Sequence, residues 1–353
     1  MPPLPASLRR AGEGGLPEVG GGDPLAAALK DLRGQEIRIA GRTPVGGGCI
    51  SRTSLLALSD GSRIFLKESS GSHPGFFRAE AEGLAALAGH APPGGALEAE
   101  PAAEGRGKGA ASAGASLGRP FSAAEWESPA RAGRGVRVPM PLYVRDDAGS
   151  QFLLLEHIEG AKRRADFWEG FGRALALLHR NVTSERFGFA ADNYIGDSPQ
   201  ENRWEEDWLL FFGEHRLRFQ AELAARRGGA DSALLAGVEA IVRRLPSLLS
   251  RPDRASLLHG DLWGGNFMVG ADGAVVLIDP AAYFGHREAD LAMTELFGGF
   301  AAPFYGAYAE LWPLEPGYEE RKDLYNLYHL LNHLNLFGGS YAGSVRSIVA
   351  RYR

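Results

Sequence analysis

Residues 257 to 290 read LLHGDLWGGNFMVGADGAVVLIDPAAYFGHREAD, and this stretch decides the fold that we expect. Asp261 lies in its opening loop, and Asn266 follows five positions later. The apolar run from Val275 to Ile278 predicts a short buried strand that leads into Asp279. An Ala-Asp-Gly turn precedes this strand, so Asn266 and Asp279 flank a predicted β-hairpin. Because a hairpin brings its two ends together, we expect Asp261, Asn266 and Asp279 to surround one small volume.

These three polar side chains suit phosphoryl transfer from a nucleotide. One Asp can accept the proton of an attacking hydroxyl, while an Asn and a second Asp can hold Mg²⁺ through oxygen ligands. Protein kinases have H-R-D, an Asn five positions after the Asp, and then a strand that carries the metal-binding Asp. Here Gly260 stands at the position of the Arg. We predict that Asp261 is the base and that Asn266 and Asp279 bind Mg²⁺; the alternative is a loop that only caps a strand.

Composition limits the class of protein. The 353 residues suffice for one two-lobed domain or two small ones. A net charge of -5 makes nucleic acid an unexpected partner, and no apolar run approaches the roughly 20 residues of a membrane span. The chain has a single cysteine, Cys49, which excludes an internal disulfide and suits a reducing compartment.

The first 23 residues are rich in Pro and Gly and show no periodicity, so we expect a disordered leader. Arg9 and Arg10, with few acidic residues nearby, leave open an organelle transit peptide, for example to a chloroplast. A cytoplasmic location is the first expectation. Asp23 and Pro24 then predict the start of a short helix over 24–32.

A glycine-rich turn and a lysine follow in a pattern of short strands. The predicted segments are a strand over 37–40, the turn over 44–51, and strands over 53–58 and 63–67. Gly46, Gly47 and Gly48 lie in the turn, where the absence of side chains lets backbone N–H groups approach phosphate oxygens. Lys67 then sits where kinases place the lysine that contacts the phosphates.

The residues 76–87 predict an amphipathic helix that faces the strands. Either Glu80 or Glu82 on this helix can pair with Lys67 and hold it, as a strand-to-helix ion pair does in kinases. The alternative is that both glutamates are solvated helix surface.

A stretch of low complexity interrupts the N-terminal half. Residues 91–135 are dominated by Ala, Gly, Pro and Ser, and we interpret them as an insertion in an N-terminal lobe that spans 24–155. Strands are predicted over 138–144 and 151–155. Residues 156–160 then form a predicted hinge, in which the backbone of Glu156 and Ile158 meets the edge of an adenine.

Residues 156–353 complete the hinge and a mainly helical C-terminal lobe. Helices are predicted over 167–180, 204–217, 234–249, 291–297, 303–311 and 318–337, and residues 193–196 are predicted to be a loop. His179 ends the first helix and is interpreted as a C-terminal cation. His329 and His333 share one helix face, but a zinc site would need a third ligand and is not expected. The fold class is therefore α+β and bilobal, with a small β-rich N-lobe and a larger helical C-lobe.

Several longer motifs resemble one family. The segments are VGGGCI at 45–50, DNYIG at 192–196, LLHGDLWGGN at 257–266, IDPAAYFGHREADLAMTELFGGF at 278–300 and PLEPGYEERKDLYNLYHLLNHLNLFGGSY at 313–341. They closely resemble the fructosamine kinases, or ketosamine 3-kinases, over nearly all of the chain outside the leader and 91–135. Aminoglycoside and choline kinases share the H-G-D, Asn and Asp pattern but not Trp263 or the long run after Asp279.

The resemblance implies a protein-kinase-like fold, ATP and Mg²⁺ as cofactors, and phosphorylation of the 3-hydroxyl of ketosamines on glycated lysines. The 3-phosphate product of this family is unstable, and its breakdown restores the amine. Glycated proteins or free ketoamines are the implied substrates. The sequence leaves open whether fructosamine, ribulosamine or erythrulosamine is preferred.

The resemblance also implies roles for individual residues in the N-lobe. Gly46, Gly47 and Gly48 would cover the ATP phosphates. Lys67 would hold these phosphates, and Glu80, rather than Glu82, would hold Lys67.

In the C-lobe the resemblance repeats the roles of Asp261, Asn266 and Asp279 and adds two candidates for the sugar pocket, Trp263 and His333. A sugar often packs on an aromatic face, but Trp263 can equally pack between the lobes. His333 can equally be a buried helix histidine that is hydrogen-bonded to the loop.

Two other classes of function stay open. One is a kinase of a free amino sugar or amino alcohol on the same fold, which Trp263 and the run after Asp279 disfavour. The other is a pseudokinase that only binds, which the joint presence of Lys67, Asp261 and Asp279 disfavours.

Cys49 follows the three glycines of the predicted phosphate loop. It is either a small packing residue or a redox-sensitive thiol. In the second case oxidation would link two chains through Cys49, so the protein is expected to be a monomer or a dimer, with a Cys49-linked dimer as the oxidised form.

Overall fold

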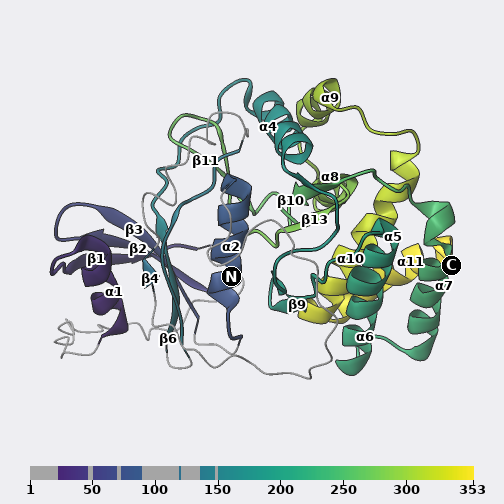
Figure 1. Ribbon diagram of the computed structural model, residues 1–353, viewed down its shortest axis with the longest axis horizontal. Coiled ribbons are helices and arrows are strands. Elements are labelled where there is room, and N and C mark those ends of the chain that lie inside the picture. Colours follow the sequence, from purple (N-terminus) through teal and green to yellow (C-terminus); the bar gives the residue numbers. More distant parts are fainter. Residues whose placement is uncertain (1–22, 47–50, 70–72, 90–118, 121–135, 148–149) are drawn as a thin grey trace, which may run out of the picture.

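A computed structural model of the protein describes residues 23–46, 51–69, 73–89, 119–120, 136–147 and 150–353. The chain forms two lobes, a smaller one built on a β-sheet and a larger one built mainly of helices (Figure 1). This arrangement confirms the predicted bilobal α+β class. The predicted leader lies outside the described residues, and of the predicted insertion only β4 is described.

The N-lobe contains a six-stranded antiparallel sheet in the order β1-β2-β3-β6-β5-β4. Its strands are β1 (Ile39–Pro44), β2 (Arg52–Leu58), β3 (Arg63–Ser69), β4 (Arg119–Pro120), β5 (Pro141–Asp147) and β6 (Ser150–Glu156). Helix α1 (Pro24–Arg33) packs on one face and helix α2 (Phe76–Ala88) on the other. The order places β3 and the hinge strand β6 side by side in the middle of the sheet.

The alternation of side chains along β3 explains where Lys67 points. Ile64 and Leu66 are buried in the small core beneath α1, whereas Phe65 packs against the core on the α2 side. Successive strand residues face opposite sides of a sheet, so Lys67 faces α2 as well. Its neighbours across the sheet are Thr53 on β2 and Leu153 on β6.

The C-lobe combines helices with three small antiparallel sheets. Its helices are α4 (Phe167–Asn181), α5 (Trp208–Phe212), α6 (Phe219–Arg226), α7 (Ser232–Leu248), α8 (Glu288–Leu296), α9 (Ala302–Leu311), α10 (Tyr318–Phe337) and α11 (Ala342–Tyr352). The strands are β7 (Thr183–Ser184), β8 (Asn193–Ile195), β9 (Ser198–Gln200), β10 (Ala255–Leu258), β11 (Phe267–Val269), β12 (Val275–Leu277) and β13 (Tyr283–Gly285). Strands β11 and β12 form the hairpin that the sequence predicts, with Phe267 opposite Leu277.

Two local predictions in the C-lobe are wrong. Residues 193–196 are not a loop, because β8 pairs with β9 across a turn in which Gly196 has a φ of 59°. The helix predicted over 204–217 begins only at Trp208, because Asp207 caps it and accepts hydrogen bonds from the N–H groups of Leu209 and Leu210.

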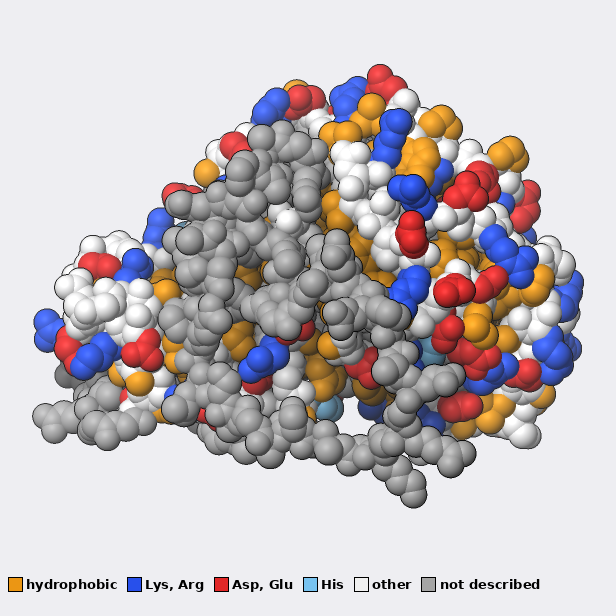
Figure 2. Space-filling model, in the orientation of Figure 1, with side chains coloured by type: hydrophobic (Ala, Val, Ile, Leu, Met, Phe, Trp, Pro, Cys, Tyr) orange, Lys and Arg blue, Asp and Glu red, His pale blue; other side chains and the backbone are white. Residues whose placement is uncertain are grey.

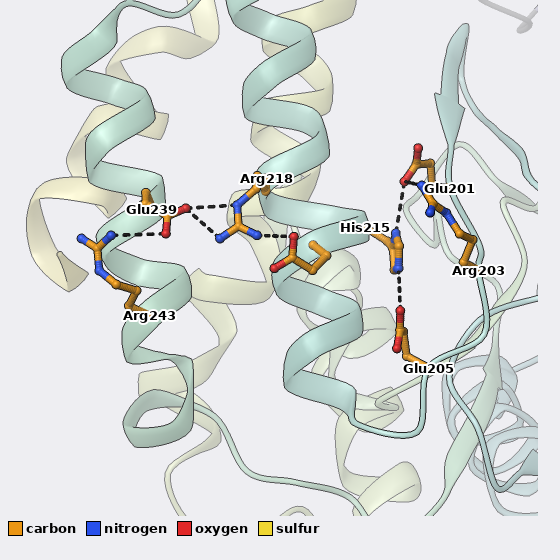
Figure 3. A network of polar contacts seen from close by, with 8 residues as sticks. Glu201, Arg203, Glu205, His215, Arg218, Glu239 and Arg243 are labelled. Atoms are coloured by element: carbon orange, nitrogen blue, oxygen red, sulfur yellow. Dashed lines mark hydrogen bonds and ion pairs between the residues drawn. The ribbon is translucent and has the colours of Figure 1, made fainter.

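After α5 the chain continues as a π-helix over Gly213–Arg218 rather than as an α-helix. Polar side chains line this wider segment (Figure 3). Both ring nitrogens of His215 lie near carboxylates, at 3.1 Å from Glu201 and 3.2 Å from Glu205. Arg218 bridges to Glu239 on α7 at 2.8 Å, which ties the π-helix to the next helix.

Acidic and basic side chains are interspersed over the face of the C-lobe in Figure 2. This face therefore presents no extended basic surface of the kind that binds nucleic acid. None of the helices in the described residues combines the length and the hydropathy that crossing a bilayer would require.

Helices α4 and α9 approach each other closely at Gly172. A Cβ at this position would lie 2.1 Å from the backbone oxygen of Phe304, whereas a Cβ at Gly170 on the same helix would meet nothing within 4 Å. We expect Gly172→Ala to lower the free energy of unfolding by about 1–3 kcal/mol, because the helices must separate.

Gly170→Ala is the matched control and should raise stability by about 0.5–1 kcal/mol through helix propensity. Urea unfolding of both variants measures the difference. Equal effects of the two substitutions would contradict this account of the packing.

Candidate active site

Lys67 is buried where the two lobes meet. Its Nζ lies 2.5 Å from an oxygen of Glu80 on α2 and 2.5 Å from Oδ1 of Asp279 in the C-lobe. Burial alone would lower the pKa of Lys67, but the charges of Asp279 and Glu80 raise it above its ordinary value. The ammonium therefore stays charged. The expected ion pair with Glu80 is confirmed.

Asp279 has an unusual backbone conformation. Its φ is 55°, and it is the one non-glycine residue among those described that has a positive φ. This left-handed region is sparsely populated by residues with a Cβ, and such strain concentrates at functional sites. The β11–β12 hairpin fixes the conformation, since the N–H of Ile278 donates to the backbone oxygen of Asn266 at 3.1 Å. The hairpin thus places Asp279 beside Asn266, as the sequence predicts.

Asn266 also contacts Asp261. Its Nδ2 donates to Oδ2 of Asp261 at 3.0 Å and to the backbone oxygen of Asp261 at 2.8 Å. Both amide hydrogens are used, so Oδ1 of Asn266 is turned away from Asp261. Burial raises the pKa of Asp261 to about 7, against the opposing hydrogen bond from Asn266. A carboxylate of this basicity suits proton abstraction near neutral pH.

The loop that carries Asp261 is held by Asp290 at the start of α8. Oδ2 of Asp290 accepts the N–H of His259 at 2.7 Å, and Oδ1 accepts the N–H of Gly260 at 2.9 Å. Burial would raise the pKa of Asp290, but the hydrogen bonds from His179 and from the N–H of Gly260 lower it. The buried carboxylate of Asp290 is therefore ionised, and both of its oxygens accept hydrogen bonds.

Two buried histidines complete this support. Nε2 of His259 donates to the backbone oxygen of Ile278 at 2.9 Å, which leaves Nδ1 to accept the N–H of Asp261 at 3.3 Å. His179 lies between Tyr308 at 2.9 Å and Asp290 at 3.2 Å. His179 lies in the last turn of α4, as predicted, but its ring is fully buried between Tyr308 of α9 and Asp290 of α8, which the sequence did not indicate.

The structure explains why glycine precedes Asp261. Gly260 has a φ of 81°, and a Cβ there would lie 2.0 Å from the backbone oxygen of Ala281. The segment after Asp279 therefore packs directly on the loop, and a side chain at 260, such as the Arg of protein kinases, has no room.

A cavity of about 320 Å³ separates the sheet of the N-lobe from the β11–β12 hairpin. Its walls are largely apolar and include Leu55, Leu155, Ile158, Met268 and Ile278. Lys67 and Asp279 also line it. The shape and lining suit an aromatic base at the hinge and phosphates near Lys67.

Glu156 lines the same cavity at the hinge. Its carboxylate is turned to Arg137 at 2.7 Å and to the N–H of Met140 at 3.3 Å. The carboxylate of Glu156 thus has partners of its own and does not interfere with the predicted contact between the backbone of Glu156 and adenine. Gly46 also lines the cavity, whereas Gly47, Gly48 and Cys49 lie outside the described residues.

A second cavity, of about 160 Å³, is lined by Asp261 and adjoins the first at Lys67 and Asp279, which line both cavities. Trp263 and His333 both line it. Trp263 is 36% exposed and meets Phe297 edge-on at 6.3 Å between ring centroids, so it does not pack between the lobes. Nδ1 of His333 donates to the backbone oxygen of His329 at 2.8 Å, within its own helix and not to the loop. Nε2 of His333 is thus left as an acceptor.

The sequence model of the fructosamine kinases matches residues 23–92 and 123–353 of this chain. The chain belongs to the fructosamine kinase family. It is 39% identical over 321 residues to a probable ketoamine kinase of Synechocystis sp., covering 90% of this chain and 92% of that protein. It is 34% identical to a chloroplastic protein-ribulosamine 3-kinase of Oryza sativa subsp. indica, covering 94% and 84%.

Solved structures agree with the family. A candidate fructosamine-3-kinase from Thermobifida fusca has a TM-score of 0.71 and 30% identity, over 92% of this chain and 97% of that one. A gentamicin complex of an aminoglycoside phosphotransferase has a TM-score of 0.52 and 12% identity, over 95% and 96%, which shows a common fold alone. As a member of the fructosamine kinase family, the chain is a phosphotransferase with a protein-kinase-like fold.

Sequence reasoning missed the residues that support the site of this fructosamine kinase. Asp290 and His179 were given no role at the site, although charged side chains are seldom fully buried unless they are paired. Asn193 and Gln200 were also missed. Their side chains donate to the backbone oxygens of Ala282 and Ala281, next to Asp279, at 2.8 and 3.1 Å.

Asp290→Asn tests the support of the loop. The substitution keeps the shape but places an NH₂ group where Asp290 accepts N–H groups from His259, Gly260 and His179. We expect a loss of about 1–3 kcal/mol in the free energy of unfolding, because a buried donor loses its partner. Urea unfolding measures it, and a variant as stable as wild type would show that Asp290 does not hold the loop.

Proposed function

We propose that this member of the family is an ATP-dependent kinase of the 3-hydroxyl of ketosamines on glycated lysines. Ribulosamines, erythrulosamines and fructosamines are the candidate acceptors. The observation that carries the proposal is that Asp261, a carboxylate of raised pKa, lines one cavity together with Trp263 and His333. This cavity shares Lys67 and Asp279 with the largely apolar cavity that suits a nucleotide. The names of the relatives described above support the choice of ketosamines.

The N-lobe residues would bind and orient ATP. The adenine would bind in the apolar cavity of about 320 Å³, next to the backbone of Glu156 and Ile158. The turn that contains Gly46, Gly47 and Gly48 would cover the phosphates. Lys67 holds the phosphates as a fixed charge, and Glu80 fixes Lys67. The transferred phosphoryl is thereby aimed at Asp261 in the C-lobe.

The residues present fit Mg²⁺. Asp279 offers a carboxylate and Asn266 offers Oδ1, which are the hard oxygen ligands that Mg²⁺ prefers. The hairpin holds both side chains on the wall of the cavity that contains Asp261, and Asp279 also lines the nucleotide cavity. When bound, the cation neutralises charge on the phosphate oxygens.

Asp261 would accept the proton of the acceptor's 3-hydroxyl as its oxygen forms a bond to the γ-phosphorus and the bond to ADP breaks. The hydrogen bond from Asn266 keeps the carboxylate pointed at the acceptor cavity. Trp263 offers a ring face for the sugar carbons, and Nε2 of His333 offers an acceptor for a sugar hydroxyl. Breakdown of the 3-phosphate then restores the amine of the lysine.

Glycated proteins or free ketoamines are the proposed substrates, and the cytoplasm is the proposed location. An organelle remains the alternative, since relatives from rice and Arabidopsis thaliana are described as chloroplastic. Regulation through oxidation of Cys49 stays a prediction, because Cys49 lies outside the residues that the structure describes.

The test is ADP release with ribuloselysine, erythruloselysine, fructoselysine and a panel of free amino sugars and amino alcohols. We expect ketosamines to be the best acceptors, and ribuloselysine to exceed fructoselysine in kcat/KM, because ribulosamines form readily from reactive pentose phosphates. Asp261→Asn is the control variant. It should bind ATP nearly normally and lose about 10²–10⁴ in turnover, the usual contribution of a general base.

Two results would contradict the proposal. Faster turnover of a free amino sugar or amino alcohol than of every ketosamine would favour the alternative kinase. Near-normal turnover by Asp261→Asn would remove Asp261 from the role of base. A higher kcat/KM for fructoselysine would overturn only the ranking of acceptors.

A further inference from the structure

The β8–β9 hairpin joins the two lobes at a second point, away from Lys67. It belongs to the C-lobe, and β9 lies on the side of that lobe that faces α2 (Figure 1). Its base contacts the segment that follows Asp279, and its tip contacts the segment that begins α2. The contacts at each end define what the hairpin does.

The base of the hairpin is fixed to the segment after Asp279. Nδ2 of Asn193 donates to the backbone oxygen of Ala282 at 2.8 Å. Nε2 of Gln200 donates to the backbone oxygen of Ala281 at 3.1 Å and to Oδ1 of Asn193 at 2.7 Å. Both amide side chains are buried. Buried hydrogen bonds that are all satisfied hold a single geometry, so the base and Asp279 form one rigid unit.

The chain after β9 strengthens this unit. Asn202 donates to the base, and its Oδ1 accepts from the wholly buried Arg216 at 2.7 Å. Arg216 also donates to the backbone oxygen of Glu201 at 2.5 Å. His215 reaches the side chains of Glu201 and Glu205, as Figure 3 shows. The π-helix thus anchors the hairpin to the body of the C-lobe.

The middle of β8 and the turn of the hairpin contact the N-lobe. The hydroxyl of Tyr194 donates to the backbone oxygen of Pro74 at 3.0 Å, and its ring lies 5.3 Å from that of Phe76 between centroids. Oδ1 of Asp197 lies 2.8 Å from Nε2 of His73. These N-lobe residues lie at the point where α2 begins.

The contacts therefore close a ring through both lobes. From the tip, α2 leads to Glu80, which pairs with Lys67, which pairs with Asp279. From Asp279 the chain leads through Ala281 back to the base of the hairpin. The position of α2 is thus set at two points, by the Lys67 ion pairs and by the hairpin contacts of Tyr194 and Asp197.

We propose that the β8–β9 hairpin is an interlobe clamp and that Tyr194 is a positioning residue, which fixes the start of α2 so that Glu80 presents Lys67 to the nucleotide. The inference rests on the nucleotide site of the proposed function. It needs no phosphorylated loop or partner, because both ends of the clamp are contacts within the chain.

Tyr194→Phe tests the clamp, since it removes only the hydroxyl that reaches Pro74. In full-length protein we expect calorimetry to show an affinity for ATP with Mg²⁺ that is about 2- to 10-fold weaker, as the loss of one hydrogen bond gives. Hydrogen exchange of the α2 amides, residues 76–88, should become faster without nucleotide. Tyr352→Phe is the matched control. It loses a hydroxyl bond of 2.7 Å to the backbone oxygen of Glu320 outside both cavities and should change neither readout.

A double-mutant cycle with Glu80→Gln separates the clamp from a general loss of stability. If Tyr194 acts through Glu80, Tyr194→Phe will weaken ATP binding little further once Glu80 is replaced. Additive losses, or unchanged exchange of α2 in Tyr194→Phe, would overturn the clamp. Absence of ATP binding by the wild type would instead contradict the proposed nucleotide site, and exchange of α2 would still decide on the clamp.

Discussion

The buried ammonium of Lys67 is the constraint on which the site depends. A charge that is only 6% exposed is stable only beside opposite charges. Its two partners come from different lobes, Glu80 from α2 and Asp279 from the end of the β11–β12 hairpin. The two lobes must therefore keep one relative position, with the proposed nucleotide cavity between them.

In the C-lobe, hydrogen bonds and close packing hold the loop of Asp261 and the segment after Asp279 in place. Asp290 holds the backbone of the loop that carries Asp261, and the close contact at Gly260 packs that loop on the segment after Asp279. Strain at Asp279 is tolerated because the hairpin and the hydrogen bonds around it leave no alternative conformation. The cavity beside Trp263, where we propose that the acceptor binds, is then fixed relative to Lys67 and Asp279.

The sequence predicted the features that depend on local patterns. The spacing and turn around Asp279 predicted the hairpin, and the helix predicted over 318–337 has the observed bounds of α10. Contacts between distant segments were beyond such reasoning. The enclosure of His179 requires α4, α8 and α9 to meet, and the late start of α5 reflects a cap by Asp207 inside a run of good helix formers. The β8–β9 hairpin was not predicted, because strands of three residues show almost no alternation in the sequence.

The central claim is that Asp279 and Lys67 together form a Mg²⁺-dependent site for ATP. Calorimetric titration of wild type, Asp279→Ala and Asn266→Ala with ATP, each with and without Mg²⁺, tests it most directly. The account predicts that Mg²⁺ strengthens binding to wild type, that Asp279→Ala abolishes this dependence, and that Asn266→Ala only weakens it. An unchanged affinity of Asp279→Ala for ATP with Mg²⁺ would contradict the account.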